Sequence, residues 1–167
     1  MELLIIRHAI AFERDPRRWP DDAARPLTPA GLRRSRKAAA GLKSFCKAPD
    51  RLLTSPLIRA KETAQVLTEV ARWPKADIVP ELKPGKGAAA VLTLLAKDRS
   101  KRIAIVGHEP DLSRFLATCI LKGQSTLSMA LKKNAAACLS FPGKARAGSA
   151  TLKWLATPRM LRGLRRP

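Results

Sequence analysis

Two short apolar runs constrain the fold of this chain more strongly than any other feature. They read ELLIIR at residues 2–7 and KRIAIVGH at residues 101–108, with apolar side chains at consecutive positions. A short run without alternation is typical of a strand that is buried on both faces. Such strands lie in sheets with helices above and below, so the two runs predict α/β layers around a largely parallel sheet.

The segments between and after these runs alternate between helical and strand-like patterns, as a parallel sheet requires. Thr28 is placed to cap a helix that has Pro29 at its first position. We expect helices over residues 29–45, 56–72, 87–98 and 110–121. A short strand is expected at residues 51–55, and a brief strand or extended segment at residues 76–82.

The last third of the chain gives a weaker pattern. AAACLSF at residues 135–141 and SATLKWLA at residues 149–156 are interpreted as a hairpin around the turn at Pro142-Gly143. The 167 residues show no repeat and no linker, so we expect a single domain over residues 1–157. Residues 158–167 are expected to form a basic, frayed C-terminal tail.

The charge of the chain is unusual, with 33 Lys and Arg against 13 Asp and Glu and a formal net charge of +20. Such a balance attracts polyanions, including nucleic acid, polyphosphate and phosphorylated partners. The basic residues are scattered and aromatic residues make up only 4% of the chain, which disfavours a single-strand nucleic-acid binder with stacking rings. Some of the basic residues either recruit acidic partner surfaces or serve solubility alone. They include Arg18, Arg33, Arg34, Lys132 and Lys133.

Other compositional features bear on the compartment. No apolar run approaches the ~20 residues of a membrane span, and no basic segment precedes an apolar one at the start of the chain. We therefore predict a cytoplasmic protein without membrane association. Cys46, Cys119 and Cys138 are an odd number without C-x-x-C spacing, so neither a disulfide framework nor a zinc site is predicted.

Polar residues suited to an anion follow three of the predicted strands, at Arg7-His8, Thr54-Ser55 and Gly107-His108. Ligands of open α/β sheets bind beyond the carboxyl ends of the strands, so we expect both histidines in one crevice. Arg59 lies in the first turns of the helix after Ser55 and should face the same crevice. Guanidinium groups and helix N-terminal amides bind phosphoryl oxygens, and a neutral imidazole can attack phosphorus in line. These residues predict a phosphoryl-transfer site.

Four ordered blocks resemble the histidine phosphatase superfamily, the phosphoglycerate-mutase-like group that uses a phosphohistidine intermediate. The blocks are RHA from Arg7, RPLTPAGLRRS from Arg25, LTSPLIRAKETA from Leu53 and IVGHEPDLS from Ile105. The short chain and the segment around Pro80 make it most similar to the SixA-type phosphohistidine phosphatases. The resemblance implies a hydrolase with a three-layer α/β/α, phosphoglycerate-mutase-like domain.

The resemblance also implies a role for each residue of the site. His8 would be the nucleophile, Arg7 and Arg59 would clamp the phosphoryl oxygens, and His108 would donate to the phosphoryl group in the transition state. Arg25 would reach the pocket from its loop. Turnover would transfer the phosphoryl group to His8, and water would then hydrolyse phospho-His8. Neither a metal nor another cofactor is expected, because cationic side chains neutralise the charge that magnesium handles elsewhere.

Two positions depart from the pattern of the superfamily. Ala9 stands where glycine usually follows the histidine, which implies that this turn needs no positive φ. Glu81 is the only carboxylate near the place of the acid that protonates alcohol leaving groups in the broad superfamily. Glu81 is therefore a candidate general acid, or else a surface or structural glutamate. Glu109 and Asp111 either orient His108 or cap the helix at Pro110, and for Asp111 the expected role is helix capping or dipole complementarity.

The leading interpretation is a phosphatase that removes the phosphoryl group from a protein phosphohistidine, since the chain is too short for inserted lids. Imidazole is a better leaving group than an alkoxide, so less general-acid help is needed. One alternative is a phosphomonoesterase, or a phosphatase of small or polymeric phosphates, in which Glu81 or another carboxylate is the acid. A further alternative is a non-enzymatic module that binds polyanions.

Overall fold

The computed structural model describes residues 1–122 and 129–164. Its centre is a six-stranded sheet in the order β3-β2-β4-β1-β5-β6. The strands are β1 (Glu2–Arg7), β2 (Arg51–Thr54), β3 (Ala76–Ile78), β4 (Arg102–Gly107), β5 (Ala136–Ser140) and β6 (Thr151–Ala156). The first four strands pair in parallel, whereas β5 pairs antiparallel with both β1 and β6. The predicted C-terminal hairpin is thus confirmed.

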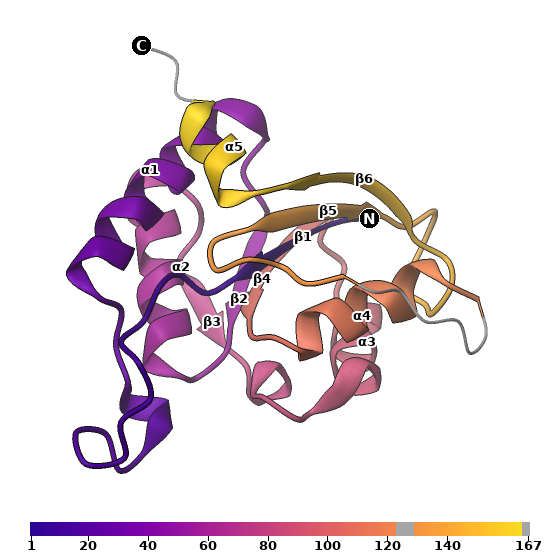
Figure 1. Ribbon diagram of the computed structural model, residues 1–167. Coiled ribbons are helices and arrows are strands. Elements are labelled where there is room, and N and C mark those ends of the chain that lie inside the picture. The colour runs from indigo at the N-terminus through magenta and orange to yellow at the C-terminus, as the bar shows by residue number, and fades with distance from the viewer. Residues whose placement is uncertain (123–128, 165–167) are drawn as a thin grey trace.

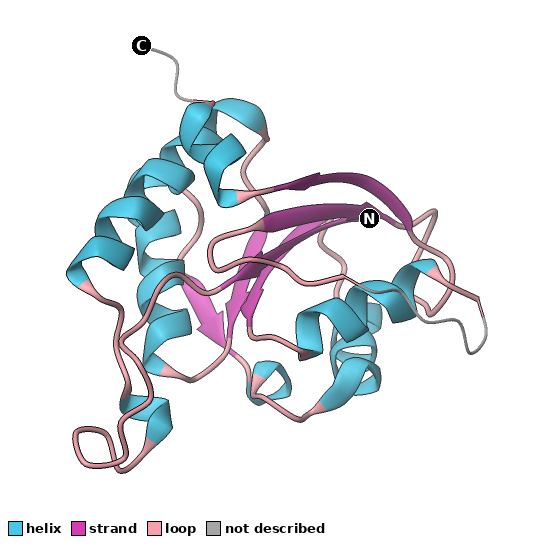
Figure 2. Ribbon diagram, in the orientation of Figure 1, coloured by secondary structure: helices cyan, strands magenta, loops and turns pink. Residues whose placement is uncertain are grey.

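Helices cover both faces of this sheet, which confirms the predicted three layers (Figures 1 and 2). One face carries α1 (Pro29–Phe45), α2 (Ile58–Ala71) and α5 (Pro158–Gly163), and the other carries α3 (Gly87–Lys97) and α4 (Asp111–Ile120). Two short 3₁₀ helices, η1 (Asp22–Ala24) and η2 (Pro80–Leu82), lie in the connections. None of the helices in the described parts of the chain is long and apolar enough to cross a membrane.

The unalternating strand β1 supplies two separate cores. Leu3 and Ile5 pack with α3 and α4, whereas Leu4 and Ile6 pack with α1, α2 and α5. All four side chains are almost completely inaccessible to solvent. Since successive side chains of a strand point to opposite faces, a strand between two helical layers must be apolar at every position.

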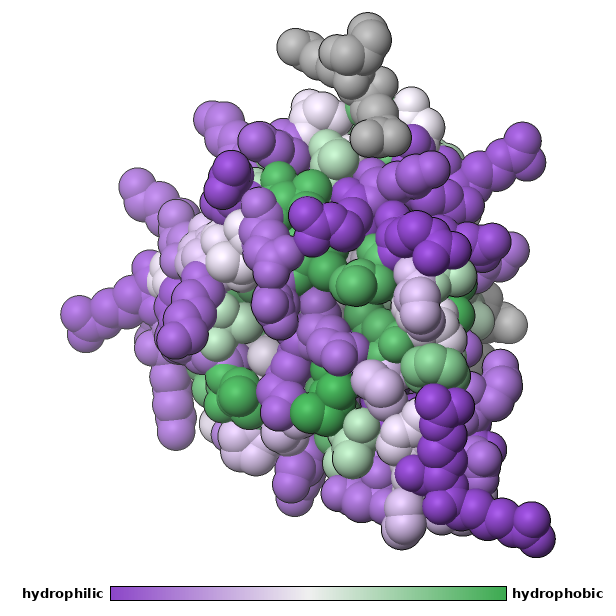
Figure 3. Space-filling view, turned by 90° about the vertical axis from the view of Figure 1, so that its left-hand side faces the viewer, coloured by the Kyte–Doolittle hydropathy of each residue, from purple (hydrophilic) through white to green (hydrophobic). Residues whose placement is uncertain are grey.

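The helix α1 begins as the sequence predicted. The Thr28 hydroxyl accepts a hydrogen bond from the Gly31 N–H at 2.9 Å, and Pro29 occupies the first turn. Hydrophilic side chains dominate the face shown in Figure 3, with small apolar patches between them. This distribution agrees with a basic, well-solvated surface on this side of the molecule.

The C-terminal end differs from the frayed tail that the sequence predicted. Residues Pro158–Gly163 form α5, which is capped by Thr157 and buries Leu161 completely. Leu161 packs in the core beneath α1, and Gly41 of α1 approaches the backbone of Leu161 so closely that no side chain fits between them. Leu161 therefore docks α5 on the core, although arginines occupy neighbouring positions of this helix. Residues 165–167 of the expected tail lie outside the described residues.

We predict that Gly41→Ala destabilises the protein by about 1–3 kcal/mol, which thermal and urea unfolding would measure. Alanine gains about 1 kcal/mol of helix propensity over glycine, but its Cβ would overlap the Leu161 carbonyl group and displace α5. The matched control is Gly143→Ala, where the added Cβ meets no atom within 4 Å. That control should change stability by less than about 0.5 kcal/mol. Equal stability of the two variants would contradict the tight packing of α1 on α5.

Candidate active site

The register of the parallel strands brings the two histidines together. Arg7 of β1 lies opposite Gly107 of β4, so His8 and His108 leave the sheet at the same edge. The His8 N–H donates to the Gly107 carbonyl oxygen at 3.1 Å. The two imidazole rings are 5.0 Å apart between centroids and tilted by 52°, and both are buried. The structure thus brings the two histidines together at the strand ends, as the sequence predicted.

Hydrogen bonding determines which nitrogen of His8 carries the hydrogen and which carries the lone pair. Its Nδ1 lies 2.7 Å from the carbonyl oxygen of Ala9. A carbonyl can only accept, so Nδ1 carries the hydrogen and Nε2 carries the lone pair. Burial lowers the pKa of His8 to about 3, and the positive charges of Arg59, Arg7 and Lys133 act in the same direction. The ring is therefore neutral at neutral pH, with a lone pair on Nε2 that could attack phosphorus.

His108 is held by a residue of the neighbouring strand end. Its Nε2 lies 2.8 Å from the hydroxyl of Ser55, which follows β2 and is completely buried. In the tautomer in which Ser55 donates to Nε2, the hydrogen of His108 lies on Nδ1. Burial lowers the pKa of His108 to about 3, with the charge of His8 as the next cause. Ser55 was noted from the sequence only as a polar strand end, and its bond to His108 shows what it contributes.

The two arginines of the site each leave one donor without a partner. Arg7 donates from Nη1 to the Leu131 carbonyl at 2.6 Å, and Arg59 donates from Nη1 to the Asp22 carbonyl at 2.8 Å. The Nε atoms of both arginines are buried without a partner, and so is Nδ1 of His108. Among the described residues, the only other buried side-chain nitrogen or oxygen without a partner is the indole nitrogen of Trp73. An unpaired buried donor costs roughly 1–3 kcal/mol, so three of them on Arg7, Arg59 and His108 favour an anionic ligand at these strand ends.

Arg25 reaches the site through Asp22. Its Nε lies 2.8 Å from Asp22 Oδ1, and the second carboxylate oxygen lies 3.1 Å from Nη2 of Arg59. The bond from Arg25 is the main reason why the pKa of Asp22 is lowered. Sequence reasoning missed Asp22, because its spacing of three residues from Arg25 is its only signal. The carboxylate links the loop arginine to the buried one.

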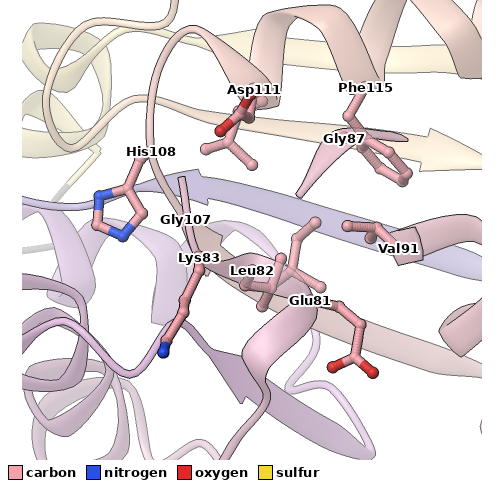
Figure 4. Close-up of a pocket in the computed structure, with 11 residues that line it drawn as sticks. Glu81, Leu82, Lys83, Gly87, Val91, Gly107, His108, Asp111 and Phe115 are labelled. Atoms are coloured by element: carbon pink, nitrogen blue, oxygen red, sulfur yellow. The ribbon is translucent and has the colours of Figure 1, made fainter. Parts of the chain in front are cut away.

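Glu81 lies in η2, on the wall of a small hollow that His108 and Phe115 also line. In Figure 4 its carboxylate points away from the imidazole of His108. The structure thus places Glu81 beside the site but does not direct its acid group at the histidines. Its role as a general acid stays a prediction.

The two carboxylates that follow His108 make contacts away from the imidazole. Glu109 Oε1 accepts from the Ser113 hydroxyl and from the Leu131 N–H, each at 2.6 Å. Asp111 accepts from the Gly85 N–H at 2.7 Å and lies in the first turn of α4, where its charge suits the helix dipole. Of the two roles expected for Asp111, helix capping or dipole complementarity, the structure agrees with the second, since the capping position is Pro110 and makes no side-chain cap bond.

The backbone after His8 agrees with alanine at the next position. Among the described residues other than glycine, only Arg72 and Asn134 have a positive φ. Ala9 is completely buried, and its N–H donates to the Thr63 hydroxyl at 2.9 Å. Within the same described residues, no three His, Cys, Asp or Glu side chains gather as a metal site would require.

Comparison with known proteins agrees with the family resemblance that the sequence shows. The family model of the histidine phosphatase superfamily (branch 1) matches residues 3–83. An uncharacterised protein of Picosynechococcus is 34% identical over 136 residues, which are 80% of this chain and 81% of that protein. The phosphohistidine phosphatase SixA of Escherichia coli K12 is 26% identical over 95% of this chain and 94% of that protein.

Solved structures show the same fold. The protein histidine phosphatase SixA in complex with tungstate superposes with a TM-score of 0.82 at 24% identity, covering 95% of this chain and 98% of that chain. A putative α-ribazole-5′-P phosphatase of Escherichia coli superposes with a TM-score of 0.71 at 19% identity, covering 95% of this chain and 97% of that chain.

We predict that neither imidazole takes up a proton between about pH 8 and pH 5. Both rings are buried among cations, and each folded-state pKa of about 3 lies below the ordinary value of 6.5. Between about pH 6.5 and pH 3 the unfolded chain binds more protons at these two histidines than the folded protein does. The free energy of unfolding should therefore be at its full value above about pH 6.5 and should decrease as the pH falls toward about 3.

NMR of labelled protein measures this directly, because the chain contains only 2 histidines. The control is the same sample in denaturant, where both rings should titrate near the ordinary pKa of about 6.5. A ring that titrates near that value in the folded protein would contradict the prediction.

Proposed function

Because this chain belongs to the histidine phosphatase superfamily, we propose that it hydrolyses phosphohistidine on a protein through a phosphoryl intermediate on His8. Its similarity to SixA-type proteins extends over nearly the whole chain, in sequence and in fold. The observation that carries the proposal is the set of unpartnered buried donors on residues that meet beside the neutral imidazole of His8. These donors are Nε of Arg7, Nε of Arg59 and Nδ1 of His108.

In the first step, Nε2 of His8 attacks the phosphorus atom and the bond from phosphorus to the substrate nitrogen breaks. The leaving imidazole takes a proton from solvent. The guanidinium groups of Arg7 and Arg59 compensate the charge on the phosphoryl oxygens, and His108 donates from Nδ1. In the second step, water attacks phospho-His8 from the side opposite the ring nitrogen. Inorganic phosphate leaves and the neutral imidazole is restored.

None of the three carboxylates near His108, those of Asp22, Glu81 and Glu109, is placed to protonate a leaving group, which favours a leaving group that needs little help from an acid. Asp22 is held in its ionised form by Arg25 and Arg59, and Glu109 is occupied by Ser113 and the Leu131 N–H. Glu81 points away from His108 (Figure 4). Imidazole is a good leaving group near neutral pH, whereas an alkoxide gains about 10²–10⁴ in rate from a general acid.

A phosphomonoesterase of the same superfamily is the second candidate. It is favoured by the position of Glu81 on the hollow beside His108 and by the fold similarity to the α-ribazole-5′-P phosphatase. In that case a change of side-chain rotamer would bring the Glu81 carboxyl toward the leaving oxygen. A non-enzymatic polyanion-binding role has only the net charge of +20 in its favour.

The phosphoenzyme tests the proposed mechanism. With a radiolabelled phosphohistidine peptide and rapid alkaline quenching, we expect an acid-labile, alkali-stable label on His8, located by peptide mapping. His8→Ala should abolish both label and turnover. His108→Ala should slow turnover roughly 10²–10³-fold, the cost of removing one transition-state donor, while the label still maps to His8. Turnover without any label on His8 would contradict the mechanism.

Glu81→Gln separates the two candidate substrate classes. We expect its kcat/KM on the phosphohistidine peptide to stay within about twofold of the wild-type value, since this reaction needs little help from an acid. The matched control is Glu13→Gln, which removes an exposed glutamate in the loop after β1. If Glu81→Gln instead lowers phosphohistidine hydrolysis tenfold or more, the assignment of an acid-independent reaction is wrong. A wild-type enzyme that prefers an alkyl phosphate would favour the phosphomonoesterase.

A further inference from the structure

The segment from Leu131 to Asn134 is fastened to the strand end that carries His8. The Leu131 carbonyl accepts from Arg7 Nη1 and its N–H donates to Glu109 Oε1, both at 2.6 Å. The Asn134 N–H lies 3.1 Å from the carbonyl oxygen of Arg7 and 3.3 Å from that of His8. The two residues between these anchor points therefore have fixed positions relative to the nucleophile.

A second set of contacts holds the same segment from the other side. The Asn134 side-chain oxygen accepts from the hydroxyl of Ser35 on α1 at 3.3 Å, and both side chains are buried. The Ala135 N–H donates to the Lys132 carbonyl at 2.7 Å and closes a turn around Lys133. Lys133 thus lies on a braced turn beside the reaction centre.

The two lysines of this turn have different surroundings. Lys132 is exposed, whereas Lys133 is half-buried, and the charge of Lys133 contributes to the lowered pKa of His8. Lys133 takes part in none of the ion pairs or side-chain hydrogen bonds formed within residues 1–122 and 129–164. Lys133, Arg7 and Arg59 all lower the pKa of His8, so the turn adds a third positive charge to the surroundings of this imidazole. An excess of positive charge around a buried site favours an anion from outside.

In the proposed mechanism the phosphoryl group already has its donors. Arg7 and Arg59 each offer a buried, unpartnered Nε and His108 offers Nδ1, while Asp22 remains ion-paired with Arg59. Lys133 is half-buried and its neighbour Lys132 is exposed, so the turn lies between the buried His8 and solvent, at a border that we call the rim. A cation at the rim suits a negative charge on the part of the substrate that stays outside the pocket.

We propose that Lys133 is a specificity-determining residue that binds an acidic side chain flanking the phosphohistidine of the protein substrate. The proposal rests on the proposed function, because it names the kind of phosphoprotein that the site prefers. It separates Lys133 from the other basic residues, which the sequence alone treats as equivalent. The net charge of +20 also favours acidic partners, through long-range attraction during encounter.

The test uses two phosphohistidine peptides of one sequence, one with Asp and Glu beside the phosphohistidine and one with Asn and Gln there. We expect the wild-type enzyme to favour the acidic peptide by about fivefold in kcat/KM, the factor that one partly exposed ion pair supplies. Lys133→Met should abolish this preference, mainly through a higher KM for the acidic peptide. Hydrolysis of the neutral peptide should stay within about twofold, and Lys133→Arg should retain the preference.

The matched control is Lys101→Met, which removes one exposed positive charge at the opposite edge of the sheet. It should leave the preference unchanged, and added salt should reduce the preference of the wild-type enzyme. An equal loss on both peptides in Lys133→Met would overturn the proposal and assign Lys133 to the phosphoryl group or to the structure of the turn. Equal hydrolysis of both peptides by the wild-type enzyme would also overturn it. Failure to hydrolyse either peptide would instead contradict the proposed function.

Discussion

The bond from the His8 N–H to the Gly107 carbonyl continues the β1–β4 ladder beyond the last residue of β1, and the geometry of the site depends on it. Both strands are buried between two helical layers, so neither can shift its register without moving apolar side chains into the wrong layer. The imidazoles of His8 and His108 are therefore held 5.0 Å apart by the sheet itself. Ser55, at the end of the adjacent strand β2, then fixes the orientation of His108.

The electrostatics of the site follow from this rigid frame. Two histidines are kept neutral by burial and by nearby cations, while the cations remain charged and only partly paired. Asp22 is the carboxylate that balances Arg59, and it does so from the short helix η1 rather than from the sheet. The site thus combines a fixed geometry of two imidazoles with a surplus of positive charge, which suits an anionic ligand.

The features that could be predicted from the sequence are those with a local signal. The apolar runs of β1 and β4, the Thr28 cap and the strand-end histidines each follow from neighbouring residues, and the structure shows each of them. The missed features depend on distant partners. Leu161 docks α5 against Gly41 far back in the chain, and the Leu131 peptide joins Arg7 to Glu109 through backbone atoms that no residue type reveals.

The bond between His8 Nδ1 and the Ala9 carbonyl has a consequence for regiochemistry. A nitrogen that carries hydrogen has no lone pair in the ring plane to offer to phosphorus, so only Nε2 can form the new bond. The proposed intermediate is therefore a single positional isomer, the one phosphorylated on the nitrogen remote from the main chain. After transfer, the Ala9 carbonyl still accepts from Nδ1 and stabilises the positive charge of the phosphorylated ring. One backbone oxygen thus selects the isomer and supports it until water arrives.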